Sequence, residues 1–386
     1  MTMNSLQNLR PLLNSIVEKG PAGGAISVFH QNEKVYEDYA GYADIDLKKP
    51  ITSDTIYRIY SMTKVVTCTA ALKLHERGLF LLEDPLEEYL PEFKNPQVYR
   101  KNGDGQIDVS PAARSIRVKD LFTMTSGLTY EGEGTETERQ VKTAMKALRE
   151  DKSFNVRKLS QSLASIPLAF DPGTQWQYGL SHDVLGAFIE AVSGKSFGEF
   201  LNDEIFQPLS MNDTFFKLPD EKKDRLCSLY NRDENGYLTE NTEMDTQYIP
   251  GTFFESGGGG LLSTLNDYSR FAHMLANGGT FDGERIIGHK TIELMAMNHL
   301  SQEQASFYSW EHLKGYGYGL GVRVLMNPAL AGSSSSIGEY GWSGLAGTWV
   351  MIDPKENLSA VYMQQMFPHM EAYIQPRLRS VIYGAL

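Results

Sequence analysis

The sequence of 386 residues contains little cysteine and comparatively little positive charge. Its two cysteines, Cys68 and Cys227, lie far apart in the chain, so we expect no disulfide framework. The 36 lysines and arginines are outnumbered by 48 aspartates and glutamates, which gives a net charge of −12. Because nucleic acids and anionic membranes are bound through basic surfaces, this balance argues against either as the main partner.

Long apolar runs and a visible targeting segment are also missing. No run approaches the roughly 18 apolar residues that a membrane-spanning helix needs. The first fifteen residues do not place a basic head before an apolar stretch, so no secretory signal is visible. We therefore expect a cytoplasmic protein without a membrane span.

The composition is that of a folded globular chain, with 41% hydrophobic and 11% aromatic residues. Apolar residues spaced three and four apart predict helices, and shorter apolar or alternating runs predict strands. The predicted helices are 6–17, 61–77, 183–192, 197–206, 265–276 and 368–383. The predicted strands are 24–30, 35–42, 319–325, 348–352 and 359–363. This order predicts an α/β (α+β) fold, in which residues 1–80 and 226–386 form one discontinuous domain and residues 81–225 form a mainly helical inserted domain.

Ser61 and Lys64 form the sharpest local motif, at the start of the second predicted helix. Side chains at positions i and i+3 share a helical face, so the amine is within reach of the hydroxyl. A serine hydroxyl needs a neighbouring group that takes its proton before it becomes a good nucleophile. The spacing alone also fits an ordinary helix-capping serine followed by a surface lysine. The apolar residues that follow, Val65 and Val66, indicate instead that this helix is buried.

Two further segments carry candidate site residues. Tyr178 follows the turn 171–173, and a tyrosine beside a lysine ammonium can serve as a general base. The segment 341–349 is rich in glycine and runs into an apolar strand, so its backbone N–H groups can approach a ligand closely. Taken singly, Tyr178 also fits a packing residue, and segment 341–349 also fits a plain strand bend.

Several patterns for other chemistries are incomplete, so we predict no metal and no cofactor. The sequence around Ser196 fits a G-x-S-x-G pattern but lies between two predicted helices, where Ser196 is expected to cap a helix. Residues 102–107 resemble part of a calcium loop but lack its closing glutamate, and we interpret them as a turn. The eight histidines form no zinc motif, and glycines 257–260 are not followed by the residues of a phosphate loop.

Taken in order, these segments resemble the serine β-lactamase and penicillin-binding-protein superfamily, and within it the class C β-lactamase-like proteins and the family VIII carboxylesterases. Residues 61–64 match Ser-x-x-Lys, residues 178–180 stand at the place of Tyr-x-Asn, and residues 342–344 stand at the place of Lys-Thr-Gly. The segments 118–128, 171–173, 208–211 and 258–264 are also similar to the connecting stretches of the family. The resemblance covers the chain from about residue 24 onward.

The resemblance implies an antiparallel sheet flanked by helices, an inserted helical domain, and an active site in the cleft between the two domains. It implies that Ser61 is the acylated nucleophile and that Lys64 and Tyr178 share the role of general base. The backbone N–H groups of Ser61 and Leu345 would form the oxyanion hole. The residues implied in substrate binding are Trp342, Ser343, Gly344 and Leu180.

Two departures from the family pattern bear on the substrate. Trp342 replaces the lysine that holds a drug carboxylate in penicillinases, and Leu180 replaces an asparagine. Both changes make the expected site less polar. The histidine common in the connector is replaced by Met124, to which we assign no mechanism.

We therefore predict a serine hydrolase that acts as a carboxylesterase on small-molecule esters, with weak β-lactam hydrolysis at most. The alternatives are an acyltransferase that passes the acyl group to an alcohol or amine, a true β-lactamase or D-amino-acid peptidase acting on amides, and a binding protein without catalysis. The sequence does not indicate an oligomeric state.

Overall fold

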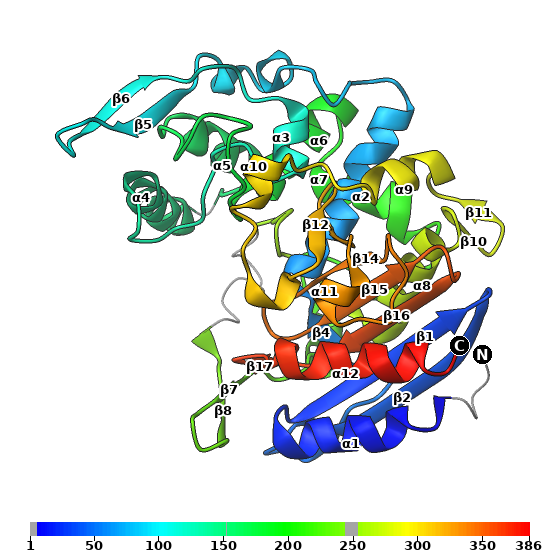
Figure 1. Cartoon of the computed structure of the whole chain (residues 1–386). Helices are drawn as coiled ribbons and strands as arrows, with labels where there is room; N and C mark the ends of the chain where they lie inside the picture. Colours follow the sequence, from blue (N-terminus) through cyan, green and yellow to red (C-terminus); the bar gives the residue numbers. More distant parts are fainter. Residues whose placement is uncertain (1–5, 152, 244–253) are drawn as a thin grey trace.

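The computed structural model describes residues 6–151, 153–243 and 254–386, and its centre is an eight-stranded sheet (Figure 1). Neighbouring strands are antiparallel throughout, in the order β12-β13-β14-β15-β16-β1-β2-β3. The strands are β1 (Gly23–His30), β2 (Glu33–Asp44), β3 (Lys49–Pro50), β12 (Tyr316–Tyr318), β13 (Arg323–Leu325), β14 (Tyr340–Ser343), β15 (Trp349–Asp353) and β16 (Leu358–Met363). The sheet therefore joins the beginning of the chain to its last quarter, with Ala25 of β1 opposite Met363 of β16.

Helices cover both faces of this sheet. The alternation of side chains in β1 sends Ile26 and Val28 to one face, where they share a buried cluster with residues of α1 (Leu9–Lys19) and α12 (Glu371–Tyr383). Ala25 points to the other face and belongs to a larger cluster with residues of α2 (Thr63–Glu76) and α8 (Leu265–Ala276). Because both faces are covered, every residue of β1 and β16 is buried.

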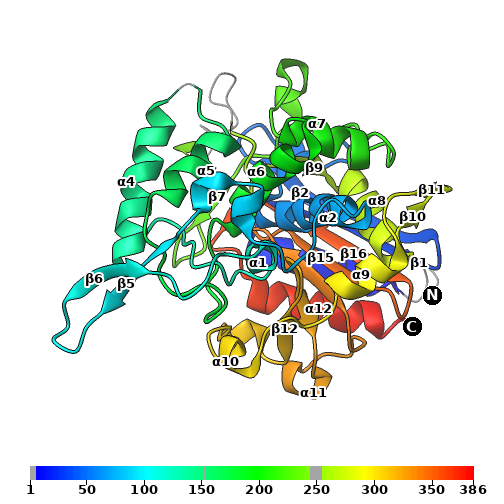
Figure 2. The ribbon, with the colours of Figure 1, turned by 90° about the horizontal axis from the view of Figure 1, so that it is seen from above.

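The segment between residues 81 and 225 is mainly helical and packs around α2. Its helices are α3 (Val118–Phe122), α4 (Glu136–Glu150), α5 (Val156–Ala164), α6 (Ser181–Ser193) and α7 (Phe197–Leu201). Helix α6 lies against both α2 and α5, and the hairpin of β5 (Gln97–Lys101) and β6 (Ile107–Pro111) extends outward beyond α4 in both views (Figures 1 and 2). The predicted antiparallel sheet with helices is confirmed, whereas the domain boundaries at 80/81 and 225/226 stay predictions.

The remaining elements are short. The strands are β4 (Ile56–Arg58) paired with β9 (Leu262–Thr264), β7 (Tyr230–Arg232) between β8 (Leu238–Glu240) and β17 (Met366–Phe367), and β10 (Thr280–Phe281) paired with β11 (Glu284–Arg285). The helices are α9 (His289–Met295), α10 (Gln302–Ala305) and α11 (Pro328–Ala331). In the described part of the chain, no helix combines the length and the apolar character required to cross a membrane.

Several predicted elements need correction. The run 319–325 is not one strand, because the chain turns at Gly321 with φ +86° between β12 and β13. The predicted helix 368–383 begins only at Glu371. Residues 102–106 form the turn of the β5–β6 hairpin and Ile107 begins β6, and the two strands were missed because polar residues interrupt their apolar ones. Ser196 caps α7 as expected, with its hydroxyl accepting a hydrogen bond from the backbone N–H of Glu199.

Candidate active site

Ser61 lies at the junction between β4 and α2, on the wall of a cavity of about 400 Å³. The strand β4 is paired with β9, and after it the chain makes a short 3-10 turn, Tyr60–Met62, before α2 begins at Thr63. Tyr60 has φ +43°, a left-handed conformation that costs a residue with a side chain roughly 1–2 kcal/mol. Ser61 therefore stands in a tight, strained turn in front of the helix and is half-buried.

Lys64 is completely buried behind Ser61 and has three hydrogen-bond partners. Its Nζ donates to Ser61 Oγ at 3.1 Å, to the Tyr130 hydroxyl at 2.9 Å and to the Gly258 carbonyl at 2.6 Å. An ammonium group has three N–H donors, so this set accounts for all of them. Burial lowers the pKa of Lys64, but the neighbouring oxygens of Tyr130, Tyr178 and Asp183 raise it more, and the pKa ends above its ordinary value. Lys64 is therefore held as a cation that points at the serine.

The glycine-rich run 257–260 delivers the carbonyl that Lys64 contacts. The Gly258 N–H donates to the buried carboxylate of Asp183 at 3.1 Å, and the Ser256 hydroxyl donates to the same carboxylate. A Cβ atom at Gly258 would lie 2.4 Å from Asp183 Oδ2. A side chain at this position would therefore displace the backbone from the lysine.

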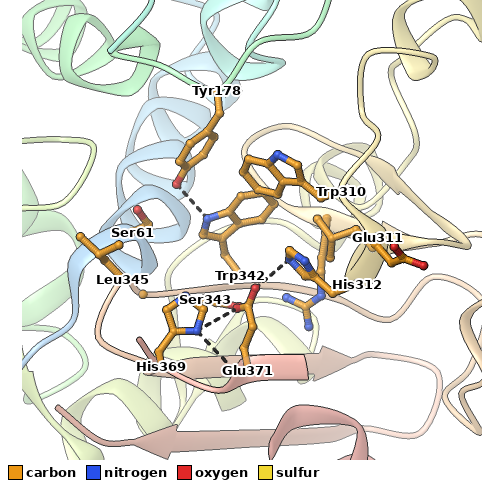
Figure 3. Close-up of a pocket in the computed structure, with 13 residues that line it drawn as sticks. Ser61, Tyr178, Trp310, Glu311, His312, Trp342, Ser343, Leu345, His369 and Glu371 are labelled. Atoms are coloured by element: carbon orange, nitrogen blue, oxygen red, sulfur yellow. Dashed lines mark hydrogen bonds and ion pairs between the residues drawn. The ribbon is translucent and has the colours of Figure 1, made fainter. Parts of the chain in front are cut away.

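Tyr178 and Trp342 contact each other in the lining of the cavity (Figure 3). The indole Nε1 of Trp342 donates to the hydroxyl oxygen of Tyr178 at 3.0 Å, and the two rings are stacked with centroids 5.6 Å apart. The Lys64 Nζ lies 4.5 Å from the centroid of the Tyr178 ring. The tyrosine oxygen is thus fixed as a hydrogen-bond acceptor, and the lysine ammonium lies over the face of the tyrosine ring.

The backbone around Gly344 approaches the segment that precedes Ser61. A Cβ atom at Gly344 would lie 2.4 Å from the carbonyl oxygen of Ile59 and 2.1 Å from Thr348 Oγ1. Only a glycine permits this approach, which places the next residue, Leu345, on the same cavity wall as Ser61. No hydrogen bond joins the backbone N–H of Leu345 to any of the residues that the structure describes. Its use as one half of an oxyanion hole stays a prediction.

The cavity brings together most of the predicted site residues with several that the sequence did not single out. Its lining consists of Ser61, Tyr178, Trp310, Glu311, His312, Leu313, Arg323, Trp342, Ser343, Gly344, Leu345, His369 and Glu371. Leu180 is absent from this lining, because it directly precedes α6 and its side chain is only 6% exposed within the core. Tyr130 was missed, although it closely follows the connector 118–128 that resembles the family.

Aromatic rings form much of the cavity wall. Trp310 meets the Tyr178 ring at 5.3 Å and the Trp342 ring at 6.2 Å, while Trp176 supports Tyr178 from behind at 6.2 Å. Such rings provide a large apolar surface for a substrate. Among the described residues, no group of three or more histidine, cysteine, aspartate and glutamate side chains is placed to hold a metal ion.

Comparisons with known proteins identify related sequences and a related fold. A family model described as Beta-lactamase matches residues 13–381. Protein Rv1367c of Mycobacterium tuberculosis is 32% identical over 365 residues, covering 93% of this chain and 89% of that protein. Esterase EstB of Burkholderia gladioli is 27% identical over 95% of this chain and 92% of its own. The structure of EstCE1, described as a hydrolase with promiscuous acyltransferase activity, superimposes with a TM-score of 0.79 at 24% identity and covers 99% of both chains.

Proposed function

Because this chain belongs to the β-lactamase family of serine hydrolases, we propose that it is a carboxylesterase that forms an acyl-enzyme on Ser61. The observation that carries the proposal is the contact of Lys64 with Ser61, inside a cavity whose wall bears Trp342 where a penicillinase has a cation. The similarity to esterase EstB supports an ester as the substrate. We infer a small-molecule ester, since the cavity measures about 400 Å³.

The reaction proceeds in two acyl transfers. Ser61 Oγ attacks the ester carbonyl carbon and gives up its proton, and the tetrahedral intermediate then expels the alcohol, which leaves with that proton. Water attacks the resulting Ser61 ester in the same way, and the acid departs as Oγ regains a proton. The backbone N–H groups of Ser61 and Leu345 stabilise the oxyanion of each intermediate.

Tyr178 is our candidate for the base that accepts the Ser61 proton. Lys64 directs all three of its N–H donors to other groups, so in this state it has no lone pair with which to accept one. To accept a proton Tyr178 acts as a phenolate, and the indole N–H of Trp342 donates to the oxygen that carries this charge. The Lys64 ammonium lies over the same ring. The Tyr130 hydroxyl accepts one of the Lys64 hydrogen bonds, at 2.9 Å, and so helps to hold the ammonium in place.

The test combines the Ser61→Ala variant with mass spectrometry of the intact protein. The native chain, mixed with 4-nitrophenyl butyrate and stopped with acid within milliseconds, is expected to gain one butyryl group on the peptide that contains Ser61. The variant is expected to show neither the adduct nor turnover above about one-thousandth of the native rate. Hydrolysis at an undiminished rate by Ser61→Ala would refute the assignment. Turnover of nitrocefin or of a D-Ala-D-Ala peptide above that of esters would favour the β-lactamase or peptidase alternative.

An acyltransferase is the second candidate, because the aromatic wall of the cavity disfavours water at the acyl-enzyme. The acyltransferase activity named for EstCE1 points the same way. Adding alcohols or amines to the esterase assay and measuring the ratio of transferred to hydrolysed acyl group separates the two activities. A ratio that does not rise with the acceptor concentration excludes transfer to the acceptors tested.

A further inference from the structure

Glu371 contributes a carboxylate to the cavity, opposite its aromatic wall (Figure 3). It is the first residue of α12, and its side chain is only 15% exposed. One carboxylate oxygen lies 2.8 Å from His312 Nε2, and the other lies 3.9 Å from His369 Nδ1 and accepts a hydrogen bond from Gln375 Nε2 at 3.2 Å. Partners from three segments therefore hold the carboxylate in one position.

This carboxylate carries its charge at neutral pH. Burial alone raises the pKa of Glu371, but the hydrogen bond from His312, the nearby His369 and the Ser343 hydroxyl outweigh burial and hold the pKa below its ordinary value. The cavity lining, all of which the structure describes, contains one arginine and no lysine. That arginine, Arg323, is paired with Glu339 at 3.0 Å, and both side chains are almost fully buried. The one arginine of the lining is therefore already paired with a carboxylate other than that of Glu371.

Ser343 is also turned toward Glu371. Its Oγ accepts a hydrogen bond from Gln375 Nε2 at 2.9 Å, and the same Nε2 donates to the Glu371 carboxylate at 3.2 Å, so one amide group holds the hydroxyl beside the carboxylate. An anionic group bound at Ser343 would therefore lie next to the Glu371 carboxylate. The neighbouring Trp342 has already donated its indole N–H to Tyr178. The segment that holds a carboxylate in penicillinases here stands next to a negative charge.

We propose that Glu371 determines the charge specificity of this cavity, rejecting esters with a carboxylate near Ser343 and favouring esters with an ammonium or hydroxyl group there. The proposal rests on the esterase function proposed above. A donor on the substrate reaches the carboxylate directly, and a cation also gains from the electron-rich faces of Trp310 and Trp342. An anion is repelled by the Glu371 carboxylate. Between unit charges about 10 Å apart in an effective dielectric of about 20, that repulsion corresponds to roughly a tenfold change in rate.

The experiment compares esters that differ only in charge. The first series varies the acyl group, as the 4-nitrophenyl esters of hexanoic acid, 6-aminohexanoic acid and adipic acid. The second varies the leaving group, as phenyl acetates with a 4-methyl, 4-aminomethyl or 4-carboxylate substituent. We expect kcat/KM for the anionic ester to be about tenfold or more below that of the neutral one in at least one series, with the cationic ester equal to or above the neutral one.

Glu371→Gln keeps the shape of the side chain and removes its charge. We expect the ratio of neutral to anionic kcat/KM to fall to about twofold or less in this variant. Glu311→Gln is the matched control, because Glu311 lines the same cavity but its side chain is 88% exposed and pairs with Lys314. It should leave the ratio unchanged. For the native enzyme, raising the ionic strength of the assay to 1 M should lower the ratio of neutral to anionic kcat/KM, since charge repulsion is then screened.

The outcomes distinguish a failure of the role proposed for Glu371 from a failure of the esterase function on which it rests. Hydrolysis of the neutral ester and labelling of Ser61 by a fluorophosphonate probe test the esterase function and do not depend on Glu371. If both are seen but the native enzyme shows no charge preference in either series, the role of Glu371 is refuted and the esterase stands. A preference for neutral over anionic esters that persists both in Glu371→Gln and at 1 M salt also refutes the role of Glu371. If neither hydrolysis nor labelling occurs, both proposals fail.

Discussion

Replacing Trp342 by phenylalanine tests how Tyr178 is activated. The change removes the indole N–H that donates to the Tyr178 oxygen at 3.0 Å and keeps an aromatic ring for the stack at 5.6 Å. A hydrogen bond to a neutral group contributes about 0.5–1.5 kcal/mol, and one to a charged group about 1.5–3 kcal/mol. If Trp342 stabilises negative charge on Tyr178 during the reaction, its hydrogen bond is stronger in the charged state than in the neutral one. The difference between these two contributions, about 1–1.5 kcal/mol, is what accelerates the reaction. We therefore expect kcat to fall roughly 5- to 15-fold.

The measurement is kcat and KM for 4-nitrophenyl butyrate, with the melting temperature of each variant as a check on folding. Trp310→Phe is the matched control, because Trp310 also contacts the Tyr178 ring, at 5.3 Å, but its indole makes no hydrogen bond to Tyr178 in the described structure. It should change KM more than kcat. A kcat for Trp342→Phe within twofold of native, or an equal loss of kcat in both variants, would refute the role given to the indole N–H.

Three further changes test other parts of the site. Tyr130→Phe removes one of the three partners of the buried lysine, and we expect kcat to fall about tenfold; an unchanged kcat would contradict this. Gly258→Ala would bring a Cβ atom 2.4 Å from Asp183 Oδ2, so urea unfolding should show a loss of about 1–3 kcal/mol, whereas Gly103→Ala, with no atom within 4 Å, should show almost none. Burial and the charge of the nearby lysine lower the pKa of His182 from 6.5 to about 3, so the unfolded chain binds more protons in that range and stability falls as the pH is lowered through it. His182→Gln should flatten the dependence of the unfolding free energy on pH between about 6 and 4, and an unaltered slope would exclude this contribution.

The parts of the site that could be predicted from the sequence are those whose partners are close in the chain. Ser61 and Lys64 are three residues apart, and a helical turn alone brings them together. Helix α8, Leu265–Ala276, was predicted with its exact bounds because its apolar spacing is regular and Thr264 caps its first turn. Tyr178 and segment 341–349 were candidates from their own residues, but only the family resemblance connected them to Ser61.

The missed residues depend on contacts across the fold. Glu371 reaches the cavity because α12 packs beneath the sheet, and nothing in its local sequence distinguishes it from the other acidic residues. His312 becomes relevant only through its contact with Glu371, 59 positions along the chain. Leu180 was assigned to substrate binding from its position in the motif, whereas packing against the core places its side chain outside the cavity lining; its role stays a prediction.

The pairing of β1 with β16 sets the order in which the molecule can be assembled during synthesis. At about 5–20 residues per second, a ribosome needs roughly 20 to 60 seconds to add the residues between these two strands. During that interval β1 can form its hairpin with β2 but lacks its other neighbour, and Ile26 and Val28 have no α12 to cover them. Ser61 is therefore made early in translation, but the sheet behind it is completed almost last. Nascent chains halted before Leu358 should expose an apolar strand edge and depend on chaperones to stay free of aggregates.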